Sequence, residues 1–384
     1  MNEYEKRKQA IQRHLAGENV TSIVKSLGKS RPWFYNWLKR YRAAGGDGNW
    51  FEDQSRAPKT TPTKVSEPLE QQVLSVRKEL EAKGMAQTGA IAISYELRNR
   101  GFNPPEVWTI NRILARHRVV RNKPVRRSNK EYPELFFHTH QMDLVGPRYI
   151  KGDGRFYSVN MIDSLSRSCS VSPVRTKGSL GIAQALAGFW TTHGMPDALQ
   201  MDNELAFRGS NRYPRSFGTV VRFALAMRVA PVFIPVAEPW RNGIIERFNN
   251  TYDKRFYRSR TFTDFDHLKQ ASGEFSHFHN SHHRYSTLDH KTPNQMRQQM
   301  LAPTLYNGQV DIEQRIPLLE GEIYFIRFIR SDCKLHLPNE SFPVDSSLKY
   351  SYVVGQISVE NHCLHILQNN KVIQTFEYTM PVDW

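Results

Sequence analysis

Apolar positions recur every three or four residues through the first 120 residues, and this spacing predicts two groups of helices. Residues 3–44 are predicted to form three helices, with Gly28 ending the second and Ser30 beginning the third. Two short helices joined by a tight glycine-containing turn are typical of a helix-turn-helix, although a plain three-helix bundle fits as well. Residues 65–120 repeat the helical spacing and predict a second domain of similar type.

The pattern changes after residue 138 to short segments rich in β-forming residues. Three strands, a helix, a strand, a helix, a strand and a long helix are predicted, which indicates a mixed sheet covered by helices. Beyond Pro317, six short strand-like segments predict a small β-barrel. The predicted organisation is a helix-turn-helix domain (1–47), a linker (48–64), a second helical DNA-binding domain (65–120), a basic linker (121–135), an α/β core (136–300) and a C-terminal β-barrel (315–384).

Charge is distributed unevenly along the chain. The net charge is +16, and residues 1–130 hold 26 Lys and Arg against 12 Asp and Glu. A basic N-terminal third favours a polyanionic partner, most simply nucleic acid, although a solvated basic face is the plainer alternative. Residues 112–130 contain eight Lys and Arg and no acid, so they fit either a phosphate-tracking segment or a solvated linker.

Membrane insertion and disulfide bonding are not expected. No run of about 18 apolar residues occurs, which argues against a transmembrane helix. The three cysteines, Cys169, Cys333 and Cys363, are far apart and form no Cys-x-x-Cys pair. They fit a reducing cytosol, so a cytoplasmic protein is expected.

Three carboxylates from distant segments are expected to converge. Asp143 lies in the first predicted core strand, Asp202 ends a short strand, and Glu246 lies in the first turn of the long helix. Ligands bind at strand ends in α/β sheets, and a helix crossing near those ends would add Glu246. Converging carboxylates repel one another unless a cation neutralises them, and all-oxygen ligands suit Mg²⁺ or Mn²⁺. Two such ions in one site could clamp a phosphoryl transfer.

Each acid also has an ordinary structural explanation when it is taken alone. Asp143 could simply end a strand, Asp202 could form an Asx turn, and Glu246 could favour the positive end of its helix. Asp163, in MIDSLSR, is predicted to cap a turn. Clustered histidines are expected to serve packing or DNA contact in preference to zinc; they are His277, His279, His282 and His283.

An ordered set of motifs resembles the DDE transposases of bacterial insertion sequences, which have a retroviral-integrase-like core. The motifs are QMDLVGP (141–147), MIDSLSRSCSV (161–171), MDNELAF (201–207), PWRNGIIERFNNTY (239–252) and HNSHHRYSTLDHKTPNQM (279–296). The resemblance extends over nearly the whole chain, since SRPWFYNWLKRY and WTINRILARHRVV also resemble the family's N-terminal helical modules.

The resemblance implies an RNase H-like core with Asp143, Asp202 and Glu246 as catalytic and metal-binding residues. It implies two Mg²⁺ or Mn²⁺ ions per site, binding to the element's terminal repeats and to target DNA, strand cleavage, 3′-hydroxyl strand transfer, and at least a dimer on DNA. Candidate DNA contacts are Lys29, Ser30, Arg31, Trp33, Arg112, Arg116, Arg126, Arg127, Trp240, Arg241, Asn242, Arg247, Lys254 and Arg255.

Three positions depart from the family pattern. The segment from Asp202 to Glu246 is longer than usual, Glu204 stands where glycine is common, and Asp253 stands where relatives carry Lys or Arg. Two other functions stay open. One is a non-catalytic, transposase-derived DNA-binding regulator, which an intact triad disfavours. The other is a nuclease acting on RNA–DNA hybrids, which the predicted N-terminal modules disfavour.

Overall fold

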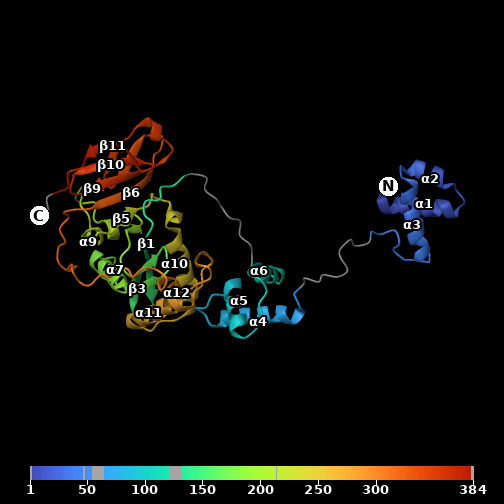
Figure 1. The fold of residues 1–384 in the computed structure, drawn as a ribbon, viewed down its shortest axis with the longest axis horizontal. Helices are drawn as coiled ribbons and strands as arrows, with labels where there is room; N and C mark the ends of the chain where they lie inside the picture. The colour runs from blue at the N-terminus through green and yellow to red at the C-terminus, as the bar shows by residue number, and fades with distance from the viewer. Residues whose placement is uncertain (1, 46–47, 54–64, 121–130, 213, 382–384) are drawn as a thin grey trace. The chain divides into compact units, whose positions relative to one another are not determined.

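The computed structural model describes residues 2–45, 48–53, 65–120, 131–212 and 214–381. The chain divides into two compact units, Met1–Lys64 and Val65–Trp384. Figure 1 shows the course of the chain and the labels of its elements. Because the two units are separate bodies, each is described by itself.

The first unit is a small three-helix domain. It contains α1 (Glu3–Leu15), α2 (Val20–Leu27) and α3 (Arg31–Ala43). Gly28 ends α2 in the left-handed conformation at φ 63°, and the Ser30 hydroxyl accepts a hydrogen bond from the Trp33 N–H at 3.3 Å. Buried apolar residues from all three helices make its core; they include Ile11, Ile23, Phe34 and Leu38. The predicted helices are therefore confirmed.

The second unit begins with three further helices, α4 (Glu67–Ala82), α5 (Ala90–Asn99) and α6 (Val107–Arg116). Val76, Ile93 and Ile113 belong to an apolar core of their own. The last helix starts at Val107. Its Glu106 cap residue makes no side-chain cap hydrogen bond, so no capping signal marked this boundary in the sequence.

A nine-stranded sheet forms the centre of this unit, in the order β11-β10-β9-β6-β5-β4-β1-β2-β3. The strands of its first half are β1 (Thr139–Ile150), β2 (Gly154–Asp163), β3 (Cys169–Val174), β4 (Ala198–Met201) and β5 (Ala230–Phe233). The first three strands are antiparallel, whereas β4 and β5 run parallel to β1. This is the mixed sheet that the sequence predicted.

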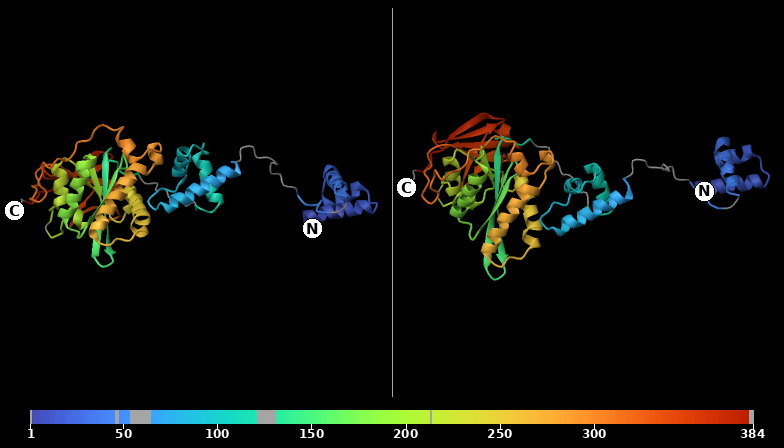
Figure 2. Two further views of the ribbon diagram at one scale, coloured as in Figure 1. Left: turned by 90° about the horizontal axis from the view of Figure 1, so that it is seen from below. Right: turned by 60° about the horizontal axis from the view of Figure 1, so that its bottom comes forward.

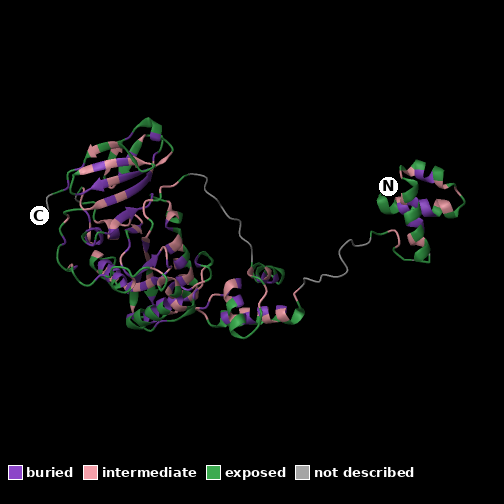
Figure 3. Cartoon of the chain, viewed as in Figure 1, coloured by how far each residue is buried: buried purple, intermediate pink, exposed green. Residues whose placement is uncertain are grey.

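Helices cover both faces of this half of the sheet, as Figure 2 shows. One apolar core joins the sheet to α7 (Ser179–His193) and α9 (Thr219–Ala226), through residues such as Met142 and Trp190. A second core joins the opposite face to α10 (Gly243–Arg255) and α11 (Phe265–His282), through residues such as Phe248 and Phe275. Figure 3 shows the buried positions concentrated between these layers. Four short elements complete this region; they are α8 (Leu205–Arg208), α12 (Pro293–Arg297), η2 (Tyr257–Ser259) and η3 (Ser286–Leu288).

The predicted C-terminal β-barrel is not confirmed. All six expected strands are present; they are β6 (Glu322–Phe328), β7 (Lys334–Leu337), β8 (Glu340–Pro343), β9 (Tyr352–Ser358), β10 (Cys363–Gln368) and β11 (Lys371–Glu377). However, β6 pairs in parallel with β5, so four of these strands extend the central sheet. Only β7 and β8 form a separate hairpin. Alternating apolar residues predict strands but do not show which edge a strand will join.

None of the described helices is long and apolar enough to cross a membrane. The basic segment 121–130 and most of the linker at 54–64 lie outside the described residues.

Candidate active site

Asp143 lies on β1, on the face of the sheet that packs against α10. Side chains alternate along a strand, so Met142 faces the core that contains α7, whereas Gln141 and Asp143 face the opposite side. The Gln141 side-chain oxygen accepts a hydrogen bond from the Ile245 N–H at 2.9 Å, which fixes the start of α10 beside β1. Asp143 is partly buried next to this contact.

Asp202 directly follows β4, the strand that pairs with β1, and Glu246 lies in the first turn of α10. A short 3₁₀ turn, η1 (Pro239–Asn242), precedes α10. Asn242 is buried there, donating to the Met142 carbonyl at 3.3 Å and accepting from the Gln200 amide at 3.1 Å. These contacts attach the beginning of the helix to β1 and β4, the strands associated with the two aspartates.

The pKa of Asp143 reflects the charges of the other two acids. Burial, which is the largest cause, and the charges of Asp202 and Glu246 together raise the pKa of Asp143 to about 6. Burial also raises the pKa of Asp202. Shifts of this kind are typical of functional sites, where like charges are held together against their repulsion.

A chain of polar side chains holds Asp143 in place. The Asn249 amide on α10 donates to the Asp143 carboxylate at 2.5 Å and accepts from the Asn160 amide at 2.8 Å. Asn160 stands opposite Asp143 in the β1–β2 ladder and accepts from the Ser158 hydroxyl at 2.8 Å. Asn249 is not among the site residues predicted from the sequence. Its spacing of three residues from Glu246 was the available signal.

The loop after β4 is fixed by the C-terminal part of the chain. The Glu204 N–H donates to the Asp202 carboxylate at 2.9 Å, and the Glu204 side chain pairs with Lys177 at 2.6 Å. Next to it, the Asn203 side-chain oxygen accepts from the buried Arg327 guanidinium of β6 at 2.7 Å. Arg327 also donates to the carbonyls of Ile234, Ile326 and His336. No sequence signal linked Arg327 to this loop.

The donor set fits a hard divalent cation. The three side chains offer only carboxylate oxygens, the ligands that Mg²⁺ and Mn²⁺ prefer. A cation would also favour the charged form of Asp143, whose pKa is raised by burial and by like charges.

Several candidate DNA contacts have partners within the protein. Arg241 donates to Glu238 at 3.1 Å and to Tyr352 at 2.9 Å, and Arg116 pairs with Glu70 at 3.0 Å. Arg255 donates to the Ala86 carbonyl and to the Thr88 hydroxyl. Asn242 is buried, as described above. These contacts give the four residues structural roles that the sequence did not reveal.

The remaining described candidates lie nearer the surface. Trp240 is 59% exposed, and Arg112, Arg247 and Lys254 are also exposed. In the first unit, Ser30 and Arg31 are exposed at the start of α3, whereas Lys29 and Trp33 are partly exposed. Lys29 pairs with Glu3 at 2.9 Å, and Arg31 donates to the Thr21 hydroxyl at 2.6 Å. Arg126 and Arg127 lie outside the described residues.

The unusual acid at Asp253 has basic neighbours. Its carboxylate pairs with Arg148 at 2.5 Å and with Arg258 at 2.6 Å. Positive charge is therefore present near this turn of α10, supplied by β1 and by the segment after the helix.

The buried histidines near α11 have packing partners. His279 contacts the Cys169 sulfur at 3.0 Å and the Tyr285 hydroxyl at 2.7 Å. His283 contacts the Met85 carbonyl at 3.1 Å. Cys169 comes from β3, more than a hundred residues away in sequence, so its proximity was not visible in the spacing.

Asp163 caps the turn after β2, as expected, by accepting from the Leu165 N–H at 2.8 Å and from the Ser166 hydroxyl at 2.5 Å.

Comparison with known families identifies two segments. Residues 227–293 match the integrase core domain, and residues 1–50 match a homeodomain-like domain. The first match includes α10 and therefore Glu246, whereas Asp143 and Asp202 precede it. The comparison with curated proteins gives no match for this chain.

Among solved structures, the chain is similar to retroviral integrases. The HTLV-2 integrase catalytic core in complex with magnesium is 18% identical, with a TM-score of 0.32, and the alignment covers 42% of this chain and 95% of that one. A chain of the simian T-cell lymphotropic virus intasome in complex with the PP2A regulatory subunit B56 gamma is 14% identical, with a TM-score of 0.38. That alignment covers 79% of this chain and 97% of that one. The BIV integrase core is 13% identical, with a TM-score of 0.32, and covers 42% of this chain and 93% of its own.

The two matched domains occur in the order that the sequence motifs predicted. The chain carries a homeodomain-like domain followed by an integrase core domain, a combination consistent with a DDE transposase.

Proposed function

We propose that this chain is a transposase that cuts and joins DNA at the ends of a bacterial mobile element. The observation that supports the proposal is the raised pKa of Asp143, to which the charges of Asp202 and Glu246 contribute. Carboxylates with raised pKa values repel one another when charged, which costs free energy in the folded protein unless a cation neutralises them. Such groups are therefore typical of functional sites.

The reaction would be two successive phosphoryl transfers. In the first, water attacks a phosphodiester at the element's end, and the leaving oxygen becomes a 3′-hydroxyl. In the second, that hydroxyl attacks a target phosphodiester, and the displaced target oxygen leaves. Asp143, Asp202 and Glu246 would hold two Mg²⁺ or Mn²⁺ ions, which supply Lewis acidity to the attacking and leaving oxygens.

The protein's own residues would position the site. Asn249 holds the Asp143 carboxylate toward α10, and Gln141 and Asn242 fix the start of that helix against β1 and β4. The homeodomain-like domain would read the terminal repeats through the start of α3. Trp240, Arg247 and Lys254 would contact DNA near the acids. Because one event joins two ends, at least two copies are expected to act together on DNA.

The test is cleavage of DNA that carries the element's own terminal repeats. We expect wild-type protein with Mg²⁺ or Mn²⁺ to cut at the repeat boundary and to join the new 3′ end to target DNA. Asp143→Asn, Asp202→Asn and Glu246→Gln should each reduce cutting by at least about 100-fold, since each removes a charge on which transition-state stabilisation depends. Sequencing gels would map the 3′ ends.

A matched control is Glu274→Gln, which removes an exposed helical glutamate on α11 that is 3.9 Å from its nearest basic partner, Arg260. This variant should cut like the wild type. Repeat binding without cutting by the wild type would favour the DNA-binding regulator. Undiminished cutting by Glu246→Gln would show that the assigned triad is wrong.

A further inference from the structure

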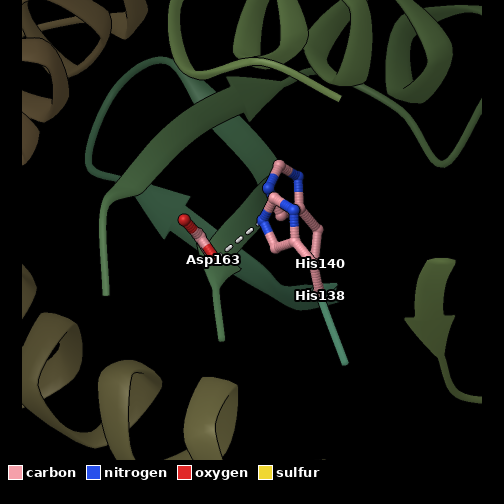
Figure 4. Close-up of side chains that lie close together, drawn as sticks. All are labelled: His138, His140 and Asp163. Carbon is pink, nitrogen blue, oxygen red and sulfur yellow. Dashed lines mark hydrogen bonds and ion pairs between the residues drawn. The ribbon is translucent and has the colours of Figure 1, made fainter. Parts of the chain in front are cut away.

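Three side chains at the end of β1 and β2 form a cluster that the proposed reaction does not use. His138 directly precedes β1, His140 lies within it, and Asp163 ends β2. His140 and Asp163 stand opposite each other in the strand ladder. One nitrogen from each histidine and one oxygen from the aspartate all lie within 4.8 Å of one another. Figure 4 shows the two imidazoles beside the carboxylate.

This cluster lies on the opposite face of the sheet from Asp143. Side chains two residues apart share a face, so His138 and His140 point to the same side as Met142, away from Asp143. The His140 ring packs edge-on against Phe189 of α7, with centroids 5.0 Å apart. The core of the sheet therefore separates this cluster from the side chains that face α10.

Of the three side chains, His140 is the one whose burial is least explained by ordinary packing. It is fully buried, and neither ring nitrogen has a hydrogen-bond partner among the described residues. A buried imidazole left in this way destabilises the folded protein, because its polar atoms lose their hydrogen bonds to water and gain none in return. In its neutral form an imidazole keeps one ring nitrogen with a free lone pair, which is the form that binds a metal ion.

The other two members are already held in position. The His138 ring nitrogen lies 3.2 Å from the Asp163 carboxylate, which also accepts from the Leu165 N–H and the Ser166 hydroxyl. Such outer contacts are typical of metal-binding carboxylates, since they fix the orientation of the ligand. A simple His–Asp pair would account for these two residues, but it would leave His140 unexplained.

We propose that His138, His140 and Asp163 bind one structural Zn²⁺ ion that joins β1 to β2. Two imidazoles and one carboxylate are a common zinc ligand set, and the same set suits Mg²⁺ poorly because that ion prefers oxygen ligands. Zinc–ligand bonds of about 2.0–2.2 Å place tetrahedral ligands roughly 3.4 Å apart. The His138–Asp163 pair is already at this separation, and rotation of the imidazole rings would bring the third atom closer.

The site would be structural because it is closed to substrates. Asp163 is 4% exposed and His140 is fully buried, so only the His138 side admits solvent. An ion there would fix the end of β1 that lies three residues before Asp143.

The experiment measures zinc in the untagged, full-length protein after washing with excess Mg²⁺. We expect about one equivalent of Zn²⁺ per wild-type chain by mass spectrometry of the metal content. Co²⁺ exchanged into the site should give visible ligand-field absorption. His138→Gln and His140→Phe should both lose this equivalent, and added Zn²⁺ should raise the thermal unfolding midpoint of the wild type but of neither variant.

Two control variants identify the site. His336→Gln removes an exposed imidazole that lies 2.7 Å from Asp332 and has no third ligand nearby within the described parts of the chain, so this variant should retain the zinc. Glu246→Gln should also retain it, which separates this site from the proposed catalytic one. If the wild type binds no zinc, or if His138→Gln and His140→Phe bind as much as the wild type, the proposal is wrong. His138→Gln keeps the partly exposed position polar, so it tests the site even if His140→Phe does not fold.

Discussion

At the scale of single residues, the charged form of Asp143 lowers the stability of the folded protein. Its carboxylate is partly removed from water and is influenced by the charges of Asp202 and Glu246, which together raise its pKa from 3.8 to about 6. The folded protein therefore holds this proton more tightly than the unfolded chain does. The resulting stabilisation is complete below about pH 4 and is lost as the pH rises through 6.

We expect Asp143→Asn to be more stable than the wild type at pH 8 in the presence of a chelator. The amide carries no charge, so the repulsion from Asp202 and Glu246 disappears, whereas the contact with Asn249 can persist. The thermal unfolding midpoint should be a few degrees higher for the variant at pH 8, and the difference should vanish near pH 4. Added Mg²⁺ should stabilise the wild type more than the variant.

Equal midpoints at pH 8 with chelator present would contradict this account of Asp143. Asn250→Ala is a suitable control, because Asn250 is an exposed neighbour on the same helix whose amide donates to the Glu246 backbone carbonyl. Its difference from the wild type should not depend on pH between 4 and 8.

At the scale of elements, the loop between α4 and α5 is attached to the core by a set of specific contacts. Gln87 exchanges two hydrogen bonds with the Arg284 backbone, at 2.9 and 2.6 Å. Arg255 of α10 donates to the Ala86 carbonyl and the Thr88 hydroxyl. The helix that carries Glu246 therefore also holds the second helical domain.

Arg255→Met should loosen this attachment without unfolding either part. Methionine keeps much of the side-chain volume but leaves the Ala86 carbonyl and the Thr88 hydroxyl without their donor, at a cost of about 1–3 kcal/mol. Local opening should become about tenfold more frequent or greater. Hydrogen exchange of residues 85–88 would measure it.

The matched control is Lys254→Met, the exposed neighbour on the same helix. Exchange in residues 85–88 should be unchanged in this control. Identical hydrogen exchange in Arg255→Met and the wild type would mean that other contacts hold the loop between α4 and α5 to the core.

The sequence predicted most individual elements, because their signals are local. Ser30 and Gly28 mark helix ends through their own backbone preferences, and the alternation in QMDLVG marks a strand. The three acids were found through motif order, but their geometric grouping was an expectation. The Asn249–Asp143 and Arg327–Asn203 contacts join segments more than a hundred residues apart, and no local pattern encodes such a pairing. The same reason explains why the joining of β6 to β5 was missed.

At the scale of the whole molecule, the C-terminal strands are part of the core. β6 covers the edge of β5, and residues such as Ile323, Phe325 and Ile329 lie in the same apolar cluster as α7 and α9. Each fully buried side chain of this kind contributes about 1.5–3 kcal/mol. Because a domain's net stability is only about 5–15 kcal/mol, the loss of several would exceed it.

A fragment of residues 65–316 should therefore fail to fold. We expect it to be insoluble, or to lack a cooperative thermal transition and to bind a hydrophobic dye. Residues 65–384 are the control, since removing the separate first unit leaves this core complete. A soluble 65–316 fragment with a cooperative transition would show that the C-terminal strands only add to a core that is stable without them.

The contact between Arg327 and Asn203 also has a consequence for which substitutions the chain can tolerate. The two residues are 124 positions apart, yet the guanidinium is buried against the loop that begins with Asp202. A lysine could not reproduce several donors in one plane, and a change at position 203 would leave a buried cation with one acceptor fewer. Mutations at the two positions are therefore expected to be tolerated together more readily than singly. Among descendants of this chain, positions 203 and 327 should covary.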